Sequence, residues 1–83
     1  MIKKDELANP QSCLNKAASD EPIFVLRAQD VFAADTILAW ADRYRRTHAP
    51  QGQWRSEAHR QKHNEAIDIV DQFERWRERK IPD

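Results

Sequence analysis

Two stretches of the chain place apolar residues at the three- and four-residue spacing of an amphipathic helix. In residues 33–47 the apolar positions are Ala34, Ile37, Leu38, Ala41 and Tyr44. In residues 54–79 they are Ala66, Ile69, Val70, Phe73 and Trp76. Pro50 and Gly52, the only glycine of the chain, lie between the two stretches and predict a turn. The pattern therefore predicts an antiparallel hairpin of two helices.

The second of these helices is expected to be long. At about 1.5 Å per residue, residues 54–79 would span nearly 40 Å. The face that carries Ala66 continues backward through Lys62, His59 and Arg55. One face is therefore apolar in its C-terminal half and basic in its N-terminal half. Either the N-terminal half projects from the body of the protein, or its basic face docks on a partner.

The residues before the hairpin predict shorter elements. Residues 1–8 are mostly charged and are expected to form a flexible tail. Asn9 and Pro10 favour the start of a short helix that continues through Ala18.

A run of four apolar residues, Ile23 to Leu26, follows in the segment 22–28. Such residues favour a strand by propensity. The chain has no second run of this kind to pair with, and an unpaired buried strand is costly. A helix over 22–28 is therefore preferred, and a strand paired with a second copy of the chain is the alternative.

Together these elements predict one all-α domain over residues 1–83, with short N-terminal helices packed on an antiparallel helical hairpin that has a long C-terminal helix. Residues 9–83 are expected to be helical apart from the connections. The predicted core consists of Ile23, Phe24, Leu26, Ile37, Leu38, Ala41, Tyr44, Ala66, Ile69, Val70, Phe73 and Trp76.

Size and charge add two constraints. A chain of 83 residues buries only about 60% of its unfolded surface, so stability is often gained from a partner or from a homodimer. The net charge is zero, but residues 1–42 carry four Lys and Arg against seven Asp and Glu, whereas residues 43–83 carry ten against seven. A protein that binds polyanions with its whole surface is normally more basic, although a local anion-facing patch is compatible with this layout.

The chain carries no pattern of export or membrane insertion. Its single cysteine, Cys13, cannot form an internal disulfide. No apolar run approaches the ~20 residues of a membrane span, and the N-terminus lacks the apolar core of a signal peptide. A cytoplasmic protein is expected.

No catalytic, metal or cofactor motif stands out. His59 and His63 lie four residues apart and face one side of the predicted helix, but no further ligand is spaced to form a recognisable metal signature with them. The sequence around Cys13 resembles no activated nucleophile, and one glycine excludes a glycine-rich phosphate loop. We expect no enzyme activity, no metal and no cofactor.

The basic region from Arg43 to His63 contains six Lys and Arg against one acid, Glu57, and includes aromatic residues. Exposed tryptophan beside arginine is typical of a protein-binding hot spot. The alternative is a small nucleic-acid-binding module, because arginine binds phosphate and aromatic rings stack on bases. The candidate partner-binding residues are Arg43, Arg46, Trp54, Arg55, His59 and Lys62.

Residues 12–30 read SCLNKAASDEPIFVLRAQD. This block resembles a group of small, uncharacterised phage- and prophage-encoded proteins that share the pattern SCxNKA…DEPxFVLRAxD, followed by an amphipathic helix. The resemblance covers residues 9–48 and transfers no site residues. It implies phage origin, the cytoplasm of a bacterial host, and an accessory protein that acts by binding a host or phage protein.

Overall fold

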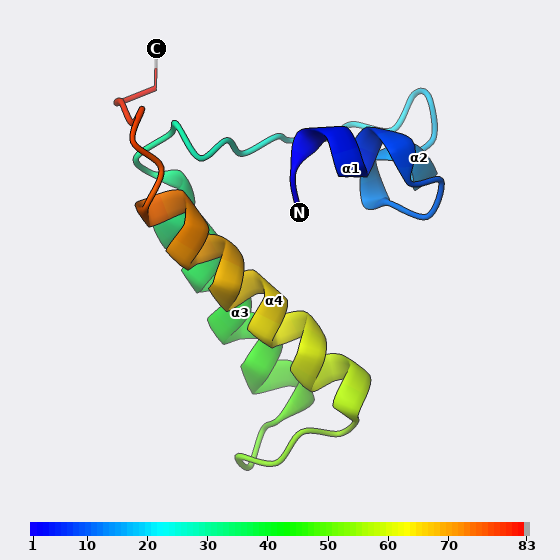
Figure 1. The fold of residues 1–83 in the computed structure, drawn as a ribbon. Helices are drawn as coiled ribbons and strands as arrows, with labels where there is room; N and C mark the ends of the chain where they lie inside the picture. Colours follow the sequence, from blue (N-terminus) through cyan, green and yellow to red (C-terminus); the bar gives the residue numbers. More distant parts are fainter. Residues whose placement is uncertain (83) are drawn as a thin grey trace.

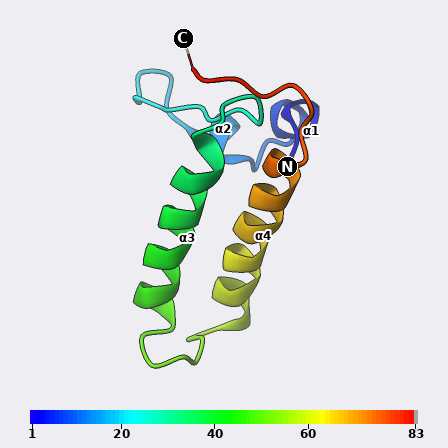
Figure 2. The ribbon, with the colours of Figure 1, turned by 90° about the vertical axis from the view of Figure 1, so that its left-hand side faces the viewer.

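The structure, a computed structural model, describes residues 1–82 and contains four helices: α1 (Lys3–Ala8), α2 (Cys13–Lys16), α3 (Ala33–His48) and α4 (Glu57–Glu74). Within these residues there is no β-strand, and an isolated parallel bridge joins Asp30 to Lys80. Helices α3 and α4 lie side by side and run in opposite directions (Figures 1 and 2). The predicted all-α class and the helical hairpin are confirmed.

Helix α3 follows the apolar pattern closely and ends one residue later than predicted. Asp35 lies in its first turn, and the last turn carries basic side chains, as the helix dipole favours. Asp42 forms an ion pair with Arg46, four residues later, at 3.0 Å. After the helix, the Gly52 N–H donates to the Ala49 carbonyl at 3.1 Å, and Gly52 adopts a φ of 83° that other residues rarely adopt. The predicted turn is therefore present.

Helix α4 is shorter than the predicted helix over 54–79. Its C-terminal end is set by contacts with the segment that precedes α3. The Lys80 N–H donates to the Gln29 carbonyl at 2.7 Å, and the Val31 N–H donates to the Lys80 carbonyl at 3.1 Å. These bonds pair residue 80 with the segment before α3 instead of with a helix, and α4 ends earlier, at Glu74, so that Trp76 lies outside it. The predicted extent of this helix is wrong at both ends.

The N-terminal region differs more from the prediction. A helix, α1, occupies residues where a tail was expected, and the helix expected to reach Ala18 is reduced to Cys13–Lys16. The Asn15 side-chain amide joins the two helices by donating to the carbonyls of Glu6, Leu7 and Asn9 at 2.8–3.0 Å. Helices α1 and α2 contact each other but neither α3 nor α4, so they do not pack on the hairpin as expected.

The helix preferred for residues 22–28 is wrong. These residues form an irregular segment that runs from the α1–α2 pair to the start of α3 (Figure 1). Consecutive β-branched and aromatic side chains disfavour a helix here, and no other part of the hairpin packs over the segment to compensate. The strand alternative has no partner within residues 1–82 either.

The core is small and consists mostly of alanine. The buried apolar residues are Ala33, Ala34, Ala41, Ala49 and Val70, and no large side chain within residues 1–82 is fully buried. Two helices cannot enclose a large side chain from all sides, so Ile37, Tyr44, Ile69 and Phe73 are only half-buried. Four predicted core residues are exposed: Ile23, Phe24, Leu38 and Trp76.

The molecule is consequently extended for its mass. Its radius of gyration is 14.2 Å, whereas a compact domain of this length has roughly 12 Å. Its accessible surface is 6915 Å², whereas a monomer of 9.8 kDa exposes about 5,200 Å². Within residues 1–82, no helix has the length and apolar character needed to cross a bilayer. The chain alone leaves much apolar surface uncovered.

Candidate functional site: the loop end of the hairpin

Six aromatic and imidazole rings gather where the α3–α4 loop closes the hairpin, and we call them the ring cluster. Helix spacing explains the arrangement, since residues four apart share one face of a helix. The cluster consists of Trp40, Tyr44 and His48 from α3, Trp54 from the loop, and His59 and His63 from α4.

The rings form a continuous stack from one helix to the other. Along α3, Trp40 stacks on Tyr44 with centroids 5.0 Å apart, and Tyr44 lies 4.5 Å from His48. Between the helices, His48 and His59 stack nearly parallel, with centroids 4.0 Å apart and planes 13° apart. The two histidines thus join α3 to α4 at the loop end.

Trp54 fastens the loop to this stack. Its half-buried ring lies 5.0 Å from His63 and 6.4 Å from Tyr44. The next residue, Arg55, donates its backbone N–H to the His48 carbonyl at 2.9 Å. The loop is therefore held against both helices by one ring and one backbone hydrogen bond.

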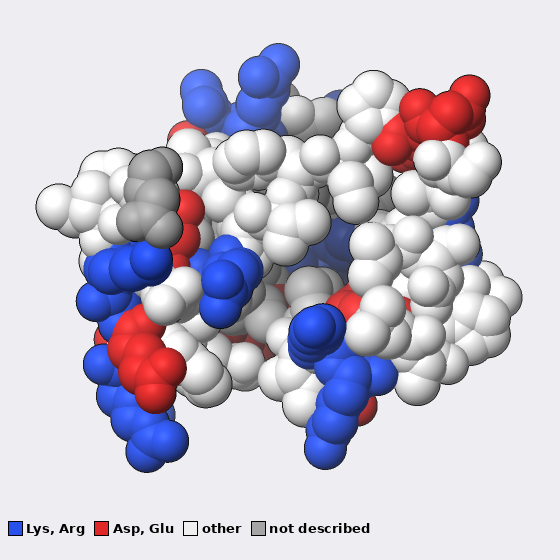
Figure 3. All heavy atoms as spheres, turned by 90° about the horizontal axis from the view of Figure 1, so that it is seen from above, with Lys and Arg blue, Asp and Glu red and all other residues white. Residues whose placement is uncertain are grey.

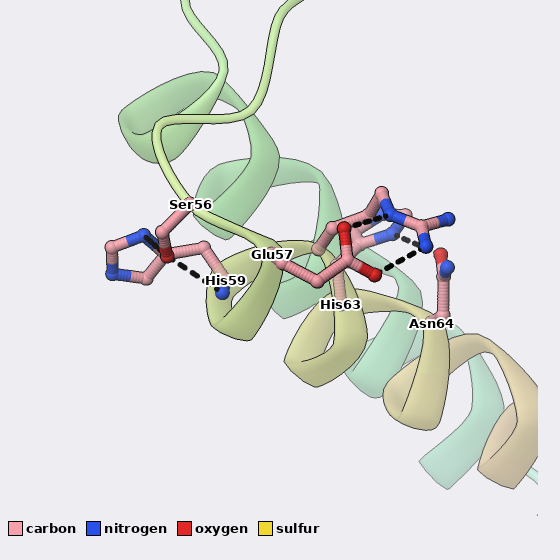
Figure 4. A network of polar contacts seen from close by, with 6 residues as sticks. Ser56, Glu57, His59, His63 and Asn64 are labelled. Carbon is pink, nitrogen blue, oxygen red and sulfur yellow. Dashed lines mark hydrogen bonds and ion pairs between the residues drawn. The ribbon is translucent and has the colours of Figure 1, made fainter.

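Ser56 caps the N-terminus of α4 and positions His59 (Figure 4). Its Oγ accepts the His59 backbone N–H at 3.1 Å and lies 2.8 Å from Nδ1 of the same residue. The two atoms lie within hydrogen-bond distance, and the tautomer of His59 decides which of them donates. Beside it, Glu57 forms an ion pair with Arg60 on the exposed side of the helix.

The surroundings of His48 favour its neutral form. Its pKa lies below the ordinary value of 6.5, first because partial burial disfavours the charged ring, and then because His59 and Arg55 bring positive charge nearby. A stack of two charged imidazolium rings would be repulsive, so the lowered pKa and the close His48–His59 contact support each other.

The positive charges around the ring cluster are of two kinds. Arg45 and Arg46 both pair with Asp42, whose pKa is lowered chiefly by its hydrogen bond from Arg45. The side chains of the other basic candidates form no ion pair within residues 1–82; these are Arg43, Arg55 and Lys62. The second group leaves positive charge available to a partner.

The structure brings most of the candidate residues to one end of the molecule. Trp54 and His59 belong to the ring cluster, and Arg55 follows Trp54 in the loop. Arg43 lines a shallow hollow of about 190 Å³ together with Trp40, Tyr44, Thr47 and His48. Arg46 differs from the others, since its charge is already paired with Asp42.

Sequence reasoning missed the part played by Trp40. The surface of this residue is 47% exposed, and its side chain lines the same hollow as Arg43. The four-residue spacing of Trp40, Tyr44 and His48 was the available signal, because it places three rings in one row on a helix.

The ring cluster presents stacked rings and not a set of converging ligand atoms. The stacked His48 and His59 rings direct their nitrogen lone pairs within parallel planes, so they do not converge on one atom. No group of three or more His, Cys, Asp or Glu within residues 1–82 is arranged to hold a metal ion. What the site offers is a pre-packed row of rings edged by unpaired cations.

Comparison with known proteins finds no matching family model, no matching curated protein and no matching solved structure.

Proposed function

We propose that the protein is a small non-enzymatic accessory protein that binds a host or phage protein through the loop end of its helical hairpin. The observation that carries this proposal is the exposed Trp40, which stacks on Tyr44 and lines one hollow with Arg43, a residue that forms no ion pair within residues 1–82. We call Trp40, Arg43, Trp54, Arg55 and Lys62 the loop-end surface.

Such a surface binds at a low entropic cost. Trp40 is already stacked on Tyr44, and Tyr44 is fixed in turn by His48. Side chains that are ordered before binding lose little freedom on contact. Tryptophan and arginine are also the residues that most often dominate binding energy at protein interfaces.

The charge of the surface indicates the kind of partner. Within residues 1–82, Arg43, Arg55 and Lys62 form no ion pair. The acids of this region already have basic partners: Asp42 pairs with Arg45 and Arg46, and Glu57 with Arg60. A partner with an acidic rim around an apolar pocket for Trp40 would complement it.

A nucleic-acid partner is the second candidate, because the same cations and rings suit phosphates and bases. Asp42 and Glu57 argue against it, since they place negative charge within the patch and neutralise neighbouring arginines. We therefore favour a protein partner.

The setting of this function is also a proposal. The resemblance of residues 12–30 to phage- and prophage-encoded proteins supports action in the cytoplasm of a bacterial host. There the protein would bind a host or phage protein without transforming it.

Affinity capture from a bacterial host lysate, read by mass spectrometry, tests the proposal with a matched pair of variants. The first variant, Trp40→Ala with Arg43→Ala, alters the loop-end surface. The second, Trp76→Ala with Arg77→Ala, removes the same residue types at the other end of the hairpin, where Trp76 is similarly exposed at 51% against 47% for Trp40.

We expect a partner that the wild type and the second variant retain and the first variant loses. Equal retention by both variants would contradict the assignment of the surface. Loss of all binding after nuclease treatment, with a steep fall as salt rises, would instead support the nucleic-acid candidate.

A further inference from the structure

The segment between α2 and α3 contains a run of backbone without hydrogen bonds. Within residues 1–82, no N–H or C=O group of residues 22–26 takes part in one. A turn precedes the run, in which the Glu21 N–H donates to the Ala18 carbonyl at 3.0 Å. Another follows it, in which the Asp30 N–H donates to the Arg27 carbonyl at 2.9 Å. The run is therefore a defined length of free backbone between two closed turns.

Its side chains are apolar and unusually exposed. The exposed fractions are 56% for Ile23, 85% for Phe24 and 66% for Val25. Figure 3 views the end of the molecule that carries this segment, and uncharged side chains cover much of that face. Three large apolar residues in a row do not normally stay in water unless something binds them.

The segment also has the composition of a strand. Ile23, Phe24 and Val25 are residue types that favour a strand. The run thus combines strand-favouring residues with unpaired backbone groups, which leaves it open to pairing with another strand.

We propose that residues 21–27 pair in antiparallel fashion with the same residues of a second copy of this chain, around a twofold axis at Phe24. This inference concerns a different surface from the proposed function and does not rest on it. It explains both the exposed Phe24 and the free backbone by one contact.

Symmetry and charge select the register. In an antiparallel pair, hydrogen-bonded and non-hydrogen-bonded positions alternate, so a twofold axis must pass where one residue faces its own copy. With Phe24 at the axis, Ile23 faces Val25 of the partner chain, and Glu21 faces Arg27 at both ends. Opposite charges across a strand pair stabilise it.

If the twofold axis moves by one residue in either direction, Glu21 and Arg27 no longer face each other. With the axis at Ile23, Arg27 would face Ser19, and with the axis at Val25 it would face Ile23. Glu21 already accepts the Ala18 N–H at 3.2 Å through one oxygen. A carboxylate can accept further hydrogen bonds, so Glu21 retains capacity for Arg27.

Proline fits the same register. If Phe24 faces its copy in a non-hydrogen-bonded pair, Pro22 also falls in such a pair, where its missing N–H costs nothing. The hydrogen bonds then fall on Ile23 and Val25, and the two Phe24 rings lie in the closer type of pair.

The exposed surface of the chain is large enough to supply an interface with a second copy. The chain exposes about 1,700 Å² more than a compact monomer of its mass, and a standard interface takes about 800 Å² from each partner. The surface that a second copy would cover is therefore available, and the self-complementary charges of Glu21 and Arg27 favour a second copy over an unrelated strand.

Sedimentation equilibrium of the full chain, from low-micromolar to submillimolar concentration, tests the proposal. We expect the wild type to dimerise. Glu21→Arg alone and Arg27→Glu alone each place like charges opposite one another twice, and each should weaken dimerisation by at least about tenfold. An equal mixture of the two variants should dimerise again, because both pairs become complementary in the mixed dimer.

Asp20→Arg is the control, since Asp20 faces Ala28 in this register and should leave the association constant unchanged. The segment lies outside all helices, so circular dichroism should show the same helix content in every variant. A wild type that stays monomeric would overturn the proposal. So would single variants that dimerise like the wild type, or a mixture that fails to restore dimerisation.

Discussion

At the residue scale, His48 makes the loop end sensitive to pH. Its pKa is lowered in the folded protein by partial burial and by the charges of His59 and Arg55. As pH falls below about 6.5, the unfolded chain therefore takes up a proton at His48 before the folded chain does. The stability that neutral His48 provides is present above that pH and is lost as pH falls toward the lowered folded value.

We expect the free energy of unfolding of His48→Gln to fall less than that of the wild type between about pH 7 and pH 5, because glutamine does not titrate. Urea unfolding at a series of pH values would measure the free energy of unfolding of both proteins. Asp42 and Glu57 have pKa values lowered mainly by their arginine partners, from 3.8 and 4.5, so they affect a more acidic range. In that more acidic range the wild type and His48→Gln should lose stability alike. Equal slopes between pH 7 and pH 5 would show that His48 is not the cause.

At the element scale, the start of α4 depends on one hydroxyl. Ser56 accepts the His59 N–H and contacts the His59 ring, so it caps the helix and fixes a member of the ring cluster. We expect Ser56→Ala to lower the free energy of unfolding by about 1 kcal/mol, the usual cost of losing such a cap. Urea unfolding followed by tryptophan fluorescence would measure it.

Ser19→Ala is the matched control for this prediction, because Ser19 is exposed and its hydroxyl forms no hydrogen bond within residues 1–82. An equal effect of the two substitutions would mean that the cap does not stabilise α4. The Ser56–Glu57 pair was a usable signal for the helix start, since a capping residue followed by an acid is typical of that position.

The hairpin could be predicted because it depends on residues that lie close together in the sequence. The periodic apolar positions of residues 33–47 fix which face of α3 turns inward, and Pro50 and Gly52 mark the turn. The end of α4 was not predictable in this way, because it depends on Lys80 meeting Gln29 and Val31 from a distant part of the chain.

The candidate site was predictable only in part for the same reason. Trp54 and His59 were identified from composition and spacing. Their contacts depend on how α3 and α4 are rotated against each other, and that rotation brings His59 onto His48 and leaves Trp40 exposed. Spacing within one helix does not contain this information.

At the scale of the whole molecule, the chain consists of two parts of unequal packing. Helices α1 and α2 contain no buried residue and contact neither α3 nor α4, whereas α3 and α4 contain buried alanines and Val70. Local opening of a helix costs little free energy where few apolar contacts hold it. The two parts should therefore differ in stability.

Hydrogen exchange on the full chain measures this difference. We expect amides of α1 and α2 to exchange at least about a hundredfold faster than the protected amides in the middle of α3 and α4. Asn15→Ala removes the side chain that joins α1 to α2, so it should speed exchange further in those two helices alone. Uniform protection, or an effect of Asn15→Ala that reaches α3 and α4, would instead show one cooperative unit. In that case the connecting segment 22–28 would have to transmit stability between the parts, which its lack of backbone hydrogen bonds at residues 22–26 argues against.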